Sequence, residues 1–110
     1  MGHSMGAYGA WSIAMNHPRR FAALGPVAGG GNPSGMAAIR HLPQYVVHGD
    51  NDKTVPVAQS RAMVEAAKKA GARVEYKEIS GGGHNEVFAP SFTAIFDFFA
   101  QHARAAAPSR

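Results

Sequence analysis

The sequence contains no cysteine and few charged residues, and each shortage excludes a class of protein. Without cysteine, the chain has no disulfide framework, no thiolate metal site and no cysteine nucleophile. Charged residues make up only 16% of the 110 residues whereas hydrophobic residues make up 45%, so the composition is that of a folded domain. No run reaches the roughly 18 apolar residues that a membrane-spanning helix needs. We therefore expect a globular chain with no membrane partner.

Basic residues outnumber acidic residues by 11 to 7, which gives a net charge of +4. Such a balance suits nucleic-acid binding when the cations gather on one face. Here they do not cluster, because Arg19-Arg20 and Lys68-Lys69 are isolated pairs without interleaved aromatic residues on which bases could stack. We expect a mildly basic, solvated surface and no nucleic-acid partner.

The start of the chain and the histidines carry two further expectations. The segment Met1-Gly2-His3-Ser4 has neither the basic region nor the apolar region of a signal peptide, which favours a cytoplasmic location. No pair of histidines has the spacing and the carboxylate companion of a zinc site, so we expect no metal and no cofactor.

Apolar residues alternate between helical spacing and strand spacing along the chain. This alternation is typical of a parallel sheet with crossover helices, and it predicts an α/β fold with about three parallel strands and flanking helices. Pro26 favours the end of a strand, because proline cannot donate to a sheet ladder. The predicted strands are residues 21–28, 44–48 and 74–77, and the predicted helices are residues 5–16, 36–40 (a turn or short helix), 55–70 and 91–105.

The last predicted helix has an apolar face. Phe92, Ile95, Phe96 and Phe99 stand at positions i, i+3, i+4 and i+7, which lie on one side of a helix. We expect all four side chains to pack in the core.

A serine between two glycines precedes the first helix. Gly2-His3-Ser4-Met5-Gly6 matches Gly-x-Ser-x-Gly, in which the serine occupies a strained turn between a strand and a helix. The flanking glycines are expected because a side chain there would collide with the turn and with the helix beneath it. Gly9 extends a stripe of small residues on the side of the helix that we expect to meet the sheet. The alternative is that Ser4 is an ordinary N-cap.

Acidic and histidine residues follow the later strands in the order that this motif requires, serine, then acid, then histidine. Asp50 and Asp52 come after the strand 44–48, and His84 follows Gly81-Gly82-Gly83 after the strand 74–77. Because the carboxyl ends of parallel strands meet at one edge of a sheet, Ser4, Asp52 and His84 are expected to lie together.

At these residues the chain resembles the C-terminal half of an α/β-hydrolase. The resemblance is to prolyl-oligopeptidase-like and dienelactone-hydrolase-like esterases of the "predicted peptidase" or carboxylesterase type, and it covers nearly the whole chain. The matching segments are residues 2–11, Asn16-His17-Pro18, Arg20-Phe21-Ala22-Ala23, His48-Gly49 with Asp52 and Val55-Pro56, and Gly83-His84. The resemblance implies that Ser4 is the nucleophile, Asp52 the acid and His84 the base of a catalytic triad.

Asp50 competes with Asp52 for the role of the acid. In the family, two variable residues separate the triad carboxylate from the Val-Pro pair that follows it, which selects Asp52 and leaves Asp50 to shape the loop. The backbone N–H of Met5 is expected to donate to the oxyanion, and the Met5 side chain to pack near the acyl pocket. His3 is a weaker candidate for contact with the substrate, and His48 is expected to be structural.

Relative to the family, the chain has little sequence before the serine. Only residues 1–3 precede Ser4, so we expect the N-terminal strands and the loop with the second oxyanion donor to be absent. An unpaired sheet edge would then promote self-association. The predicted organisation is one partial domain over residues 1–110, with the elbow and helix in 1–17, the acid loop in 48–56, the histidine loop in 80–86 and the C-terminal helix in 91–105.

Two classes of function are consistent with the sequence. The first is a serine hydrolase, truncated, that cleaves a small-molecule carboxylic ester or a peptide through an acyl-enzyme. The alternative is a non-catalytic hydrolase remnant that serves as an assembly or interaction module.

Overall fold

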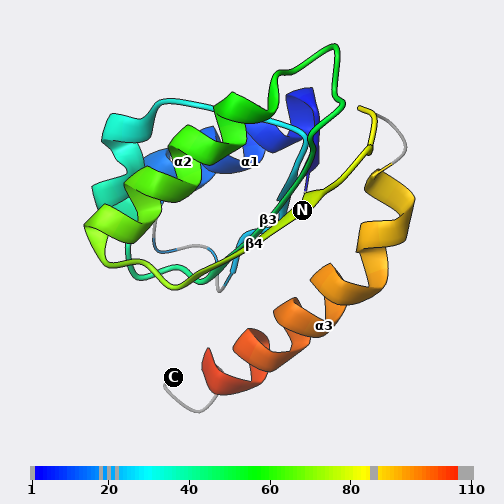
Figure 1. The fold of residues 1–110 in the computed structure, drawn as a ribbon. Coiled ribbons are helices and arrows are strands. Elements are labelled where there is room, and N and C mark those ends of the chain that lie inside the picture. Colours follow the sequence, from blue (N-terminus) through cyan, green and yellow to red (C-terminus); the bar gives the residue numbers. More distant parts are fainter. Residues whose placement is uncertain (1, 18, 20, 22, 85–86, 107–110) are drawn as a thin grey trace.

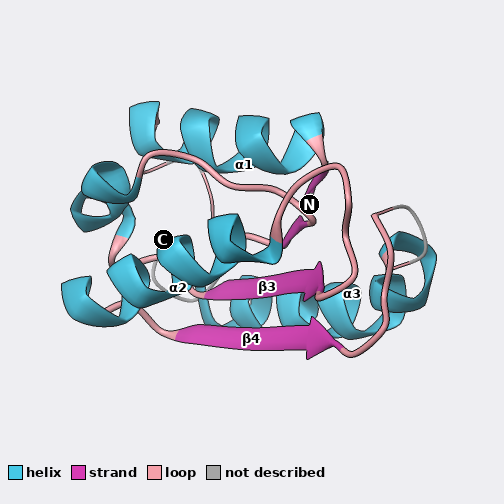
Figure 2. Ribbon diagram, turned by 45° about the horizontal axis from the view of Figure 1, so that its top comes forward, coloured by secondary structure: helices cyan, strands magenta, loops and turns pink. Residues whose placement is uncertain are grey.

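A four-stranded parallel sheet organises the chain in the computed structural model, which describes residues 2–17, 19, 21, 23–84 and 87–106. The strands lie in the order β1-β2-β3-β4, so each strand pairs with the next one in the sequence. Figures 1 and 2 label the two longer strands, β3 and β4, which lie side by side. The elements are β1 (Gly2–His3), α1 (Met5–Asn16), β2 (Pro26–Val27), the 3-10 helix η1 (Pro33–Ile39), β3 (Gln44–Gly49), α2 (Val57–Ala70), β4 (Val74–Ile79) and α3 (Phe88–Ala106). The predicted α/β class is confirmed, with a short fourth strand at Gly2–His3 that the sequence did not indicate.

Strand β2 is much shorter than the predicted strand 21–28. Only Pro26 and Val27 belong to it, and a single further bridge joins Leu24 to β3. Pro26 has no N–H for a ladder, and Phe21 is 39% exposed rather than buried. Residue 22 lies outside the described residues. The long strand was therefore wrong, and Pro26 marks a short segment of pairing.

Helices cover both faces of the sheet (Figure 1). On one face, Trp11 of α1 and Met63 of α2 pack with Val46 of β3 in a buried cluster that also includes residues of η1. On the other face, Val47 of β3 packs with Ile95 of α3. Val46 and Val47 point to opposite sides because side chains alternate along a strand, and the fold is therefore a three-layer α/β/α arrangement.

The buried face of α3 differs from the predicted one. Ile95 and Phe98 are buried, but Phe96 is 55% exposed and Phe99 is only partly buried. The side chain of Phe92 lies outside the described residues. The buried residues Ser91, Ile95 and Phe98 are four and three positions apart, so they share one face of α3. Phe96 lies outside this buried face, and the prediction that it packs in the core was wrong.

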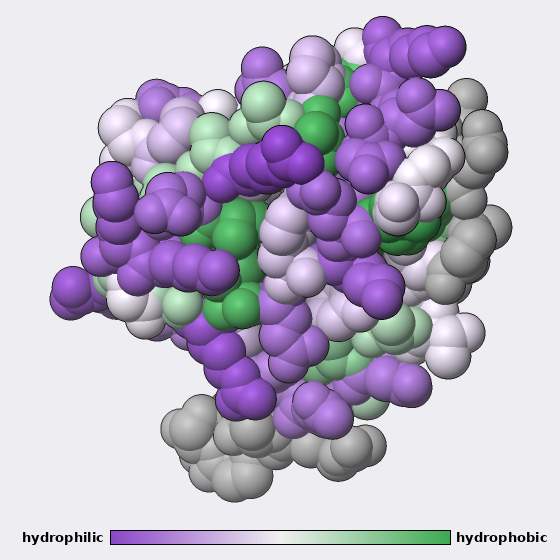
Figure 3. Space-filling view, in the orientation of Figure 1, coloured by the Kyte–Doolittle hydropathy of each residue, from purple (hydrophilic) through white to green (hydrophobic). Residues whose placement is uncertain are grey.

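Polar side chains dominate the face drawn in Figure 3, where hydrophobic areas are small and separated. Within the described residues, no helix combines the length and the apolar character that crossing a membrane requires.

The outer strand β4 carries an ion pair with α2. Glu78 accepts hydrogen bonds from Arg61 Nε at 2.8 Å and Nη2 at 2.7 Å, and from the Tyr76 hydroxyl at 2.8 Å. The hydrogen bonds from Arg61, followed by that from Tyr76, lower the pKa of Glu78 from 4.5 to about 2. This carboxylate therefore favours the folded state only while it is ionised.

We expect this pair to make stability depend on pH between about 4.5 and about 2. Above this window Glu78 is ionised in both states; as the pH falls through it, the unfolded state takes up a proton first and stability decreases. The loss is about 1 kcal/mol or less, because surface ion pairs are weakened by solvent. Thermal unfolding followed by circular dichroism should show a flatter acid dependence for Glu78→Gln than for wild type. Glu75→Gln, an exposed site on the same strand, is the control, and equal slopes for Glu78→Gln and wild type would contradict the expectation.

Candidate active site

Ser4 lies in the turn between β1 and α1 and has an unusual backbone conformation. Its φ of 58° and ψ of −116° fall where non-glycine residues are rarely found. The turn is held on both sides, because Ser4 N donates to Val27 O at 2.9 Å and Ala7 N donates to Ser4 O at 2.9 Å. The Ser4 side chain forms no cap hydrogen bond with α1, so the N-cap interpretation does not describe this hydroxyl.

The glycines around Ser4 have different roles. A Cβ on Gly2 would overlap the backbone carbonyl of Gly6, as the motif predicts for a tight turn. In contrast, a Cβ on Gly6 or on Gly9 would meet no atom within 4 Å. The predicted collision at Gly6 and the predicted packing of Gly9 against the sheet were therefore wrong for the described residues. Helix α1 instead comes close to Gly29 in the loop after β2, where an added Cβ would overlap the Cβ of Ala7.

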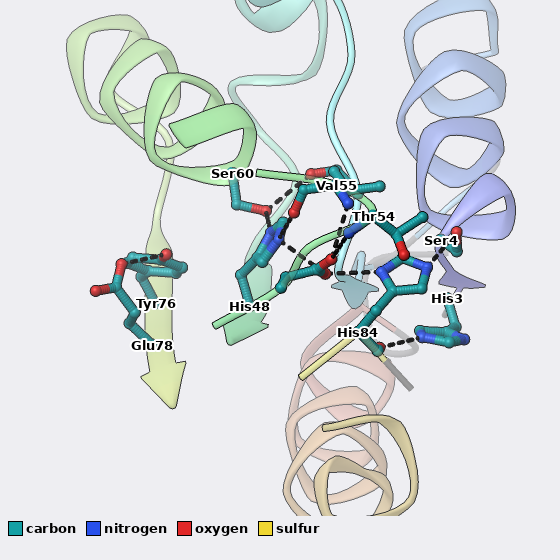
Figure 4. Close-up of polar contacts among 11 residues, drawn as sticks. His3, Ser4, His48, Thr54, Val55, Ser60, Tyr76, Glu78 and His84 are labelled. Carbon is teal, nitrogen blue, oxygen red and sulfur yellow. Dashed lines mark hydrogen bonds and ion pairs between the residues drawn. The ribbon is translucent and has the colours of Figure 1, made fainter. Parts of the chain in front are cut away.

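The structure brings Ser4, His84 and Asp52 into one chain of contacts. Figure 4 labels Ser4 and His84 of this chain. His84 Nε2 lies 2.7 Å from Ser4 Oγ, and His84 Nδ1 lies 2.7 Å from Asp52 Oδ2. Asp52 follows β3 and His84 follows β4, so both residues lie at the edge of the sheet where β1 leads into Ser4. A serine, an imidazole and a carboxylate in this order can move a proton from the hydroxyl to the imidazole.

The Asp52 carboxylate is buried and held by backbone donors. Its Oδ1 accepts hydrogen bonds from Thr54 N at 2.9 Å and from Val55 N at 2.8 Å. Burial raises the pKa of Asp52, but the hydrogen bonds from Val55, His84 and Thr54 together outweigh burial and place the pKa below its usual value. Asp52 is therefore ionised at neutral pH and can accept from His84.

Asp50 lies apart from this arrangement. It is exposed, and its Oδ1 accepts a hydrogen bond of 2.7 Å from the backbone N of Gly81. This contact ties the loop after β3 to the loop after β4.

His3 and Met5 flank the serine in the sequence. His3 Nε2 lies 2.7 Å from the backbone oxygen of His84, and the His3 ring stacks on Phe88 at a centroid distance of 4.6 Å. Met5 is the first residue of α1, so its N–H has no acceptor within the helix and is available to an anion. The Met5 side chain is 85% exposed in the described structure, and its expected place near an acyl pocket stays a prediction.

One further polar residue at the site was assigned only a structural role from the sequence. His48 is fully buried at the end of β3, and its Nε2 lies 3.2 Å from Asp52 Oδ2. The sequence offered one indication of this contact, the position of His48 four residues before Asp52. Because β3 is buried almost continuously, buried and exposed residues do not alternate along it, and the sequence could not show where the His48 ring points.

The described residues also include a cavity that is separate from this arrangement. A cavity of about 440 Å³ between α1 and the loop before η1 is lined by residues that include Tyr8, Ser12 and Asn32, but by none of Ser4, Asp52 and His84. In the same described part of the chain, no group of three or more histidine, cysteine, aspartate or glutamate residues could hold a metal ion.

Solved structures with a similar fold include esterases and a predicted hydrolase. A thermostable esterase is 36% identical over 77% of this chain, with a TM-score of 0.72. SOBER1 of Arabidopsis thaliana is 19% identical over 93% of the chain, with a TM-score of 0.78. A predicted CIB-like hydrolase of Thermoplasma acidophilum is 26% identical over 89%, with a TM-score of 0.68. The chain spans 24%, 51% and 48% of these three proteins, respectively. No family model and no curated protein matches the sequence.

The parallel strand order, the helices on both faces and these neighbours together define the class of fold. The chain has a partial α/β-hydrolase fold, in agreement with the resemblance noted in its sequence. The narrower likeness to prolyl-oligopeptidase-like and dienelactone-hydrolase-like esterases remains a prediction.

Proposed function

We propose that this chain carries the catalytic residues of a serine hydrolase that cleaves a small-molecule carboxylic ester. The observation that carries the proposal is the pair of 2.7 Å contacts joining Ser4 Oγ to His84 and His84 to Asp52. The esterases among the structural neighbours support the same chemistry. Since the chain spans about half or less of these neighbours, the activity of a longer protein is included in the proposal.

In the proposed reaction, Ser4 Oγ attacks the carbonyl carbon of the ester while its proton moves to His84 Nε2. Asp52 holds Nδ1–H of His84, so that Nε2 is the nitrogen that accepts, and it stabilises the imidazolium that forms. The Met5 N–H donates to the oxygen that becomes negatively charged. The bond to the alcohol then breaks, His84 returns the proton to the leaving oxygen, and an acyl group remains on Ser4. His84 then takes a proton from water, which attacks this acyl group. The bond to Ser4 Oγ breaks, His84 returns the proton to this oxygen, and the carboxylic acid leaves.

A fluorophosphonate probe tests the proposed nucleophile directly, because it reacts with an activated serine and releases fluoride. Labelling of the chain is expected in the wild type and is expected to be lost in Ser4→Ala. The matched control is Ser12→Ala, an exposed serine of the same helix, which should be labelled like the wild type. Labelling that persists in Ser4→Ala would exclude Ser4 as the nucleophile.

A further inference from the structure

His48 is a buried imidazole that touches the carboxylate of Asp52 and has no part in the proposed reaction. Its Nε2 lies 2.8 Å from the backbone oxygen of Val55 and 3.2 Å from Asp52 Oδ2. On the other side of the ring, Nδ1 lies 2.7 Å from Ser60 Oγ (Figure 4). The side chains of His48 and Asp52 are both fully buried, so no water screens the contact between them.

The neighbours of Nε2 fix where the ring carries a hydrogen. A backbone carbonyl can only accept, so the contact with Val55 O requires Nε2–H. The same N–H edge lies beside Asp52 Oδ2, the oxygen that accepts from His84 Nδ1. Asp52 Oδ2 therefore lies between two imidazoles, whereas Oδ1 is occupied by the two backbone donors described above.

Ser60 of α2 holds the opposite edge of the ring. Its hydroxyl donates to the backbone oxygen of Gly29 at 2.9 Å, and its oxygen lies 2.7 Å from His48 Nδ1. The network thus connects the loop after β2, helix α2 and the acid loop through side chains that are completely buried. Buried polar networks of this kind give a defined geometry only when their members are satisfied together.

Building on the proposed hydrolase function, we propose that His48 is a positioning residue for the triad acid. Its Nε2–H holds the Val55 carbonyl and lies beside Asp52 Oδ2, which fixes the carboxylate opposite His84 and reduces the negative charge that Oδ2 presents to it. Other titratable groups nearby are His3, which lies against His84, and Glu78 on β4, which is paired with Arg61.

Two amide substitutions of His48 test separately the contacts made by its two ring nitrogens. His48→Gln keeps an amide donor near the place of Nε2, toward Val55 and Asp52, whereas His48→Asn keeps a polar atom only near the place of Nδ1, toward Ser60. We expect the fluorophosphonate labelling rate of Ser4 to fall about tenfold to a hundredfold in His48→Asn and to stay within a few-fold of wild type in His48→Gln, because small displacements of catalytic groups are costly.

The dependence of the labelling rate on pH distinguishes positioning from a purely structural role. Without a donor beside Oδ2, Asp52 holds the protonated form of His84 more strongly, so the midpoint of the rate profile should move to higher pH in His48→Asn and not in His48→Gln. Thermal unfolding of both variants serves as the control for folding. Equal loss of rate in the two variants with an unchanged midpoint would overturn the proposal.

Nitrogen-15 spectra of the wild-type imidazoles provide a test that needs neither a variant nor activity. We expect the His48 signals to show a hydrogen on Nε2, and a ring with a bare Nε2 would overturn the proposal. If wild type is not labelled at all, the proposed hydrolase function fails, while these spectra still decide the position of the His48 hydrogen.

Discussion

Replacing Asp52 by asparagine is expected to slow the labelling of Ser4 by about 10⁴-fold, the loss typical of a triad that holds the wrong tautomer of its histidine. The two backbone donors at Oδ1 would bind the amide oxygen, since only that end can accept from Thr54 N and Val55 N. The amide NH₂ group would then face His84 Nδ1. His84 would turn its bare nitrogen toward this group and carry its hydrogen on Nε2, where it can no longer accept the proton of Ser4.

The control is Asp50→Asn, which keeps an oxygen able to accept from Gly81 N. We expect its labelling rate to remain within a few-fold of wild type. The rates are compared under pseudo-first-order conditions at one pH, with folding checked by circular dichroism. The opposite ranking of the two variants would assign the role of the acid to Asp50.

Replacing Gly2 by alanine is expected to reduce stability and labelling together. The new methyl group would overlap the carbonyl of Gly6, and neither backbone segment can move without shifting the turn that holds Ser4. Overpacking of this kind costs about 1–3 kcal/mol of stability. A displacement of Ser4 Oγ by about 1 Å would lower its reactivity toward the probe by roughly a hundredfold.

Gly6→Ala is the matched control, because a Cβ at Gly6 meets nothing within 4 Å and Gly6 lies in helix α1. Alanine is favoured over glycine in a helix by about 1 kcal/mol, so this variant should be at least as stable as wild type. Chemical denaturation and probe labelling measure both properties. If Gly2→Ala matched Gly6→Ala in both, the turn would not need glycine at position 2.

Sequence periodicity was sufficient for elements with a clear apolar pattern. The predicted helix 5–16 coincides with α1 (Met5–Asn16), and the predicted strand 44–48 lies within β3 (Gln44–Gly49). Strand β4 continues to Ile79, past the change of phase at Glu78, because full pairing with β3 and the ion pair with Arg61 keep Glu78 in the strand. Local pattern alone could not include these tertiary contacts.

The order of the motif residues was sufficient to predict that Ser4, Asp52 and His84 lie together, because the carboxyl ends of parallel strands meet at one edge of a sheet. Contacts within that edge could not be predicted in the same way. The link between His48 and Asp52 depends on the direction of a ring in a strand with continuous burial. Likewise, the exposure of Met5 and Phe96 depends on how each helix is rotated about its axis against the sheet. The spacing of apolar residues in the sequence does not determine this rotation closely enough to predict the exposure of a single side chain.

The contact between Ser4 and His84 joins residues 80 positions apart, which follow the two outer strands of the described sheet. Contacts between such distant residues form late in folding, because the entropy of closing the intervening loop must first be overcome. Under the proposed mechanism, a chain emerging from the ribosome would present Ser4 long before His84 has been synthesised. During this interval the serine has the reactivity of an ordinary hydroxyl, and the nascent protein cannot attack esters until the whole sheet has assembled.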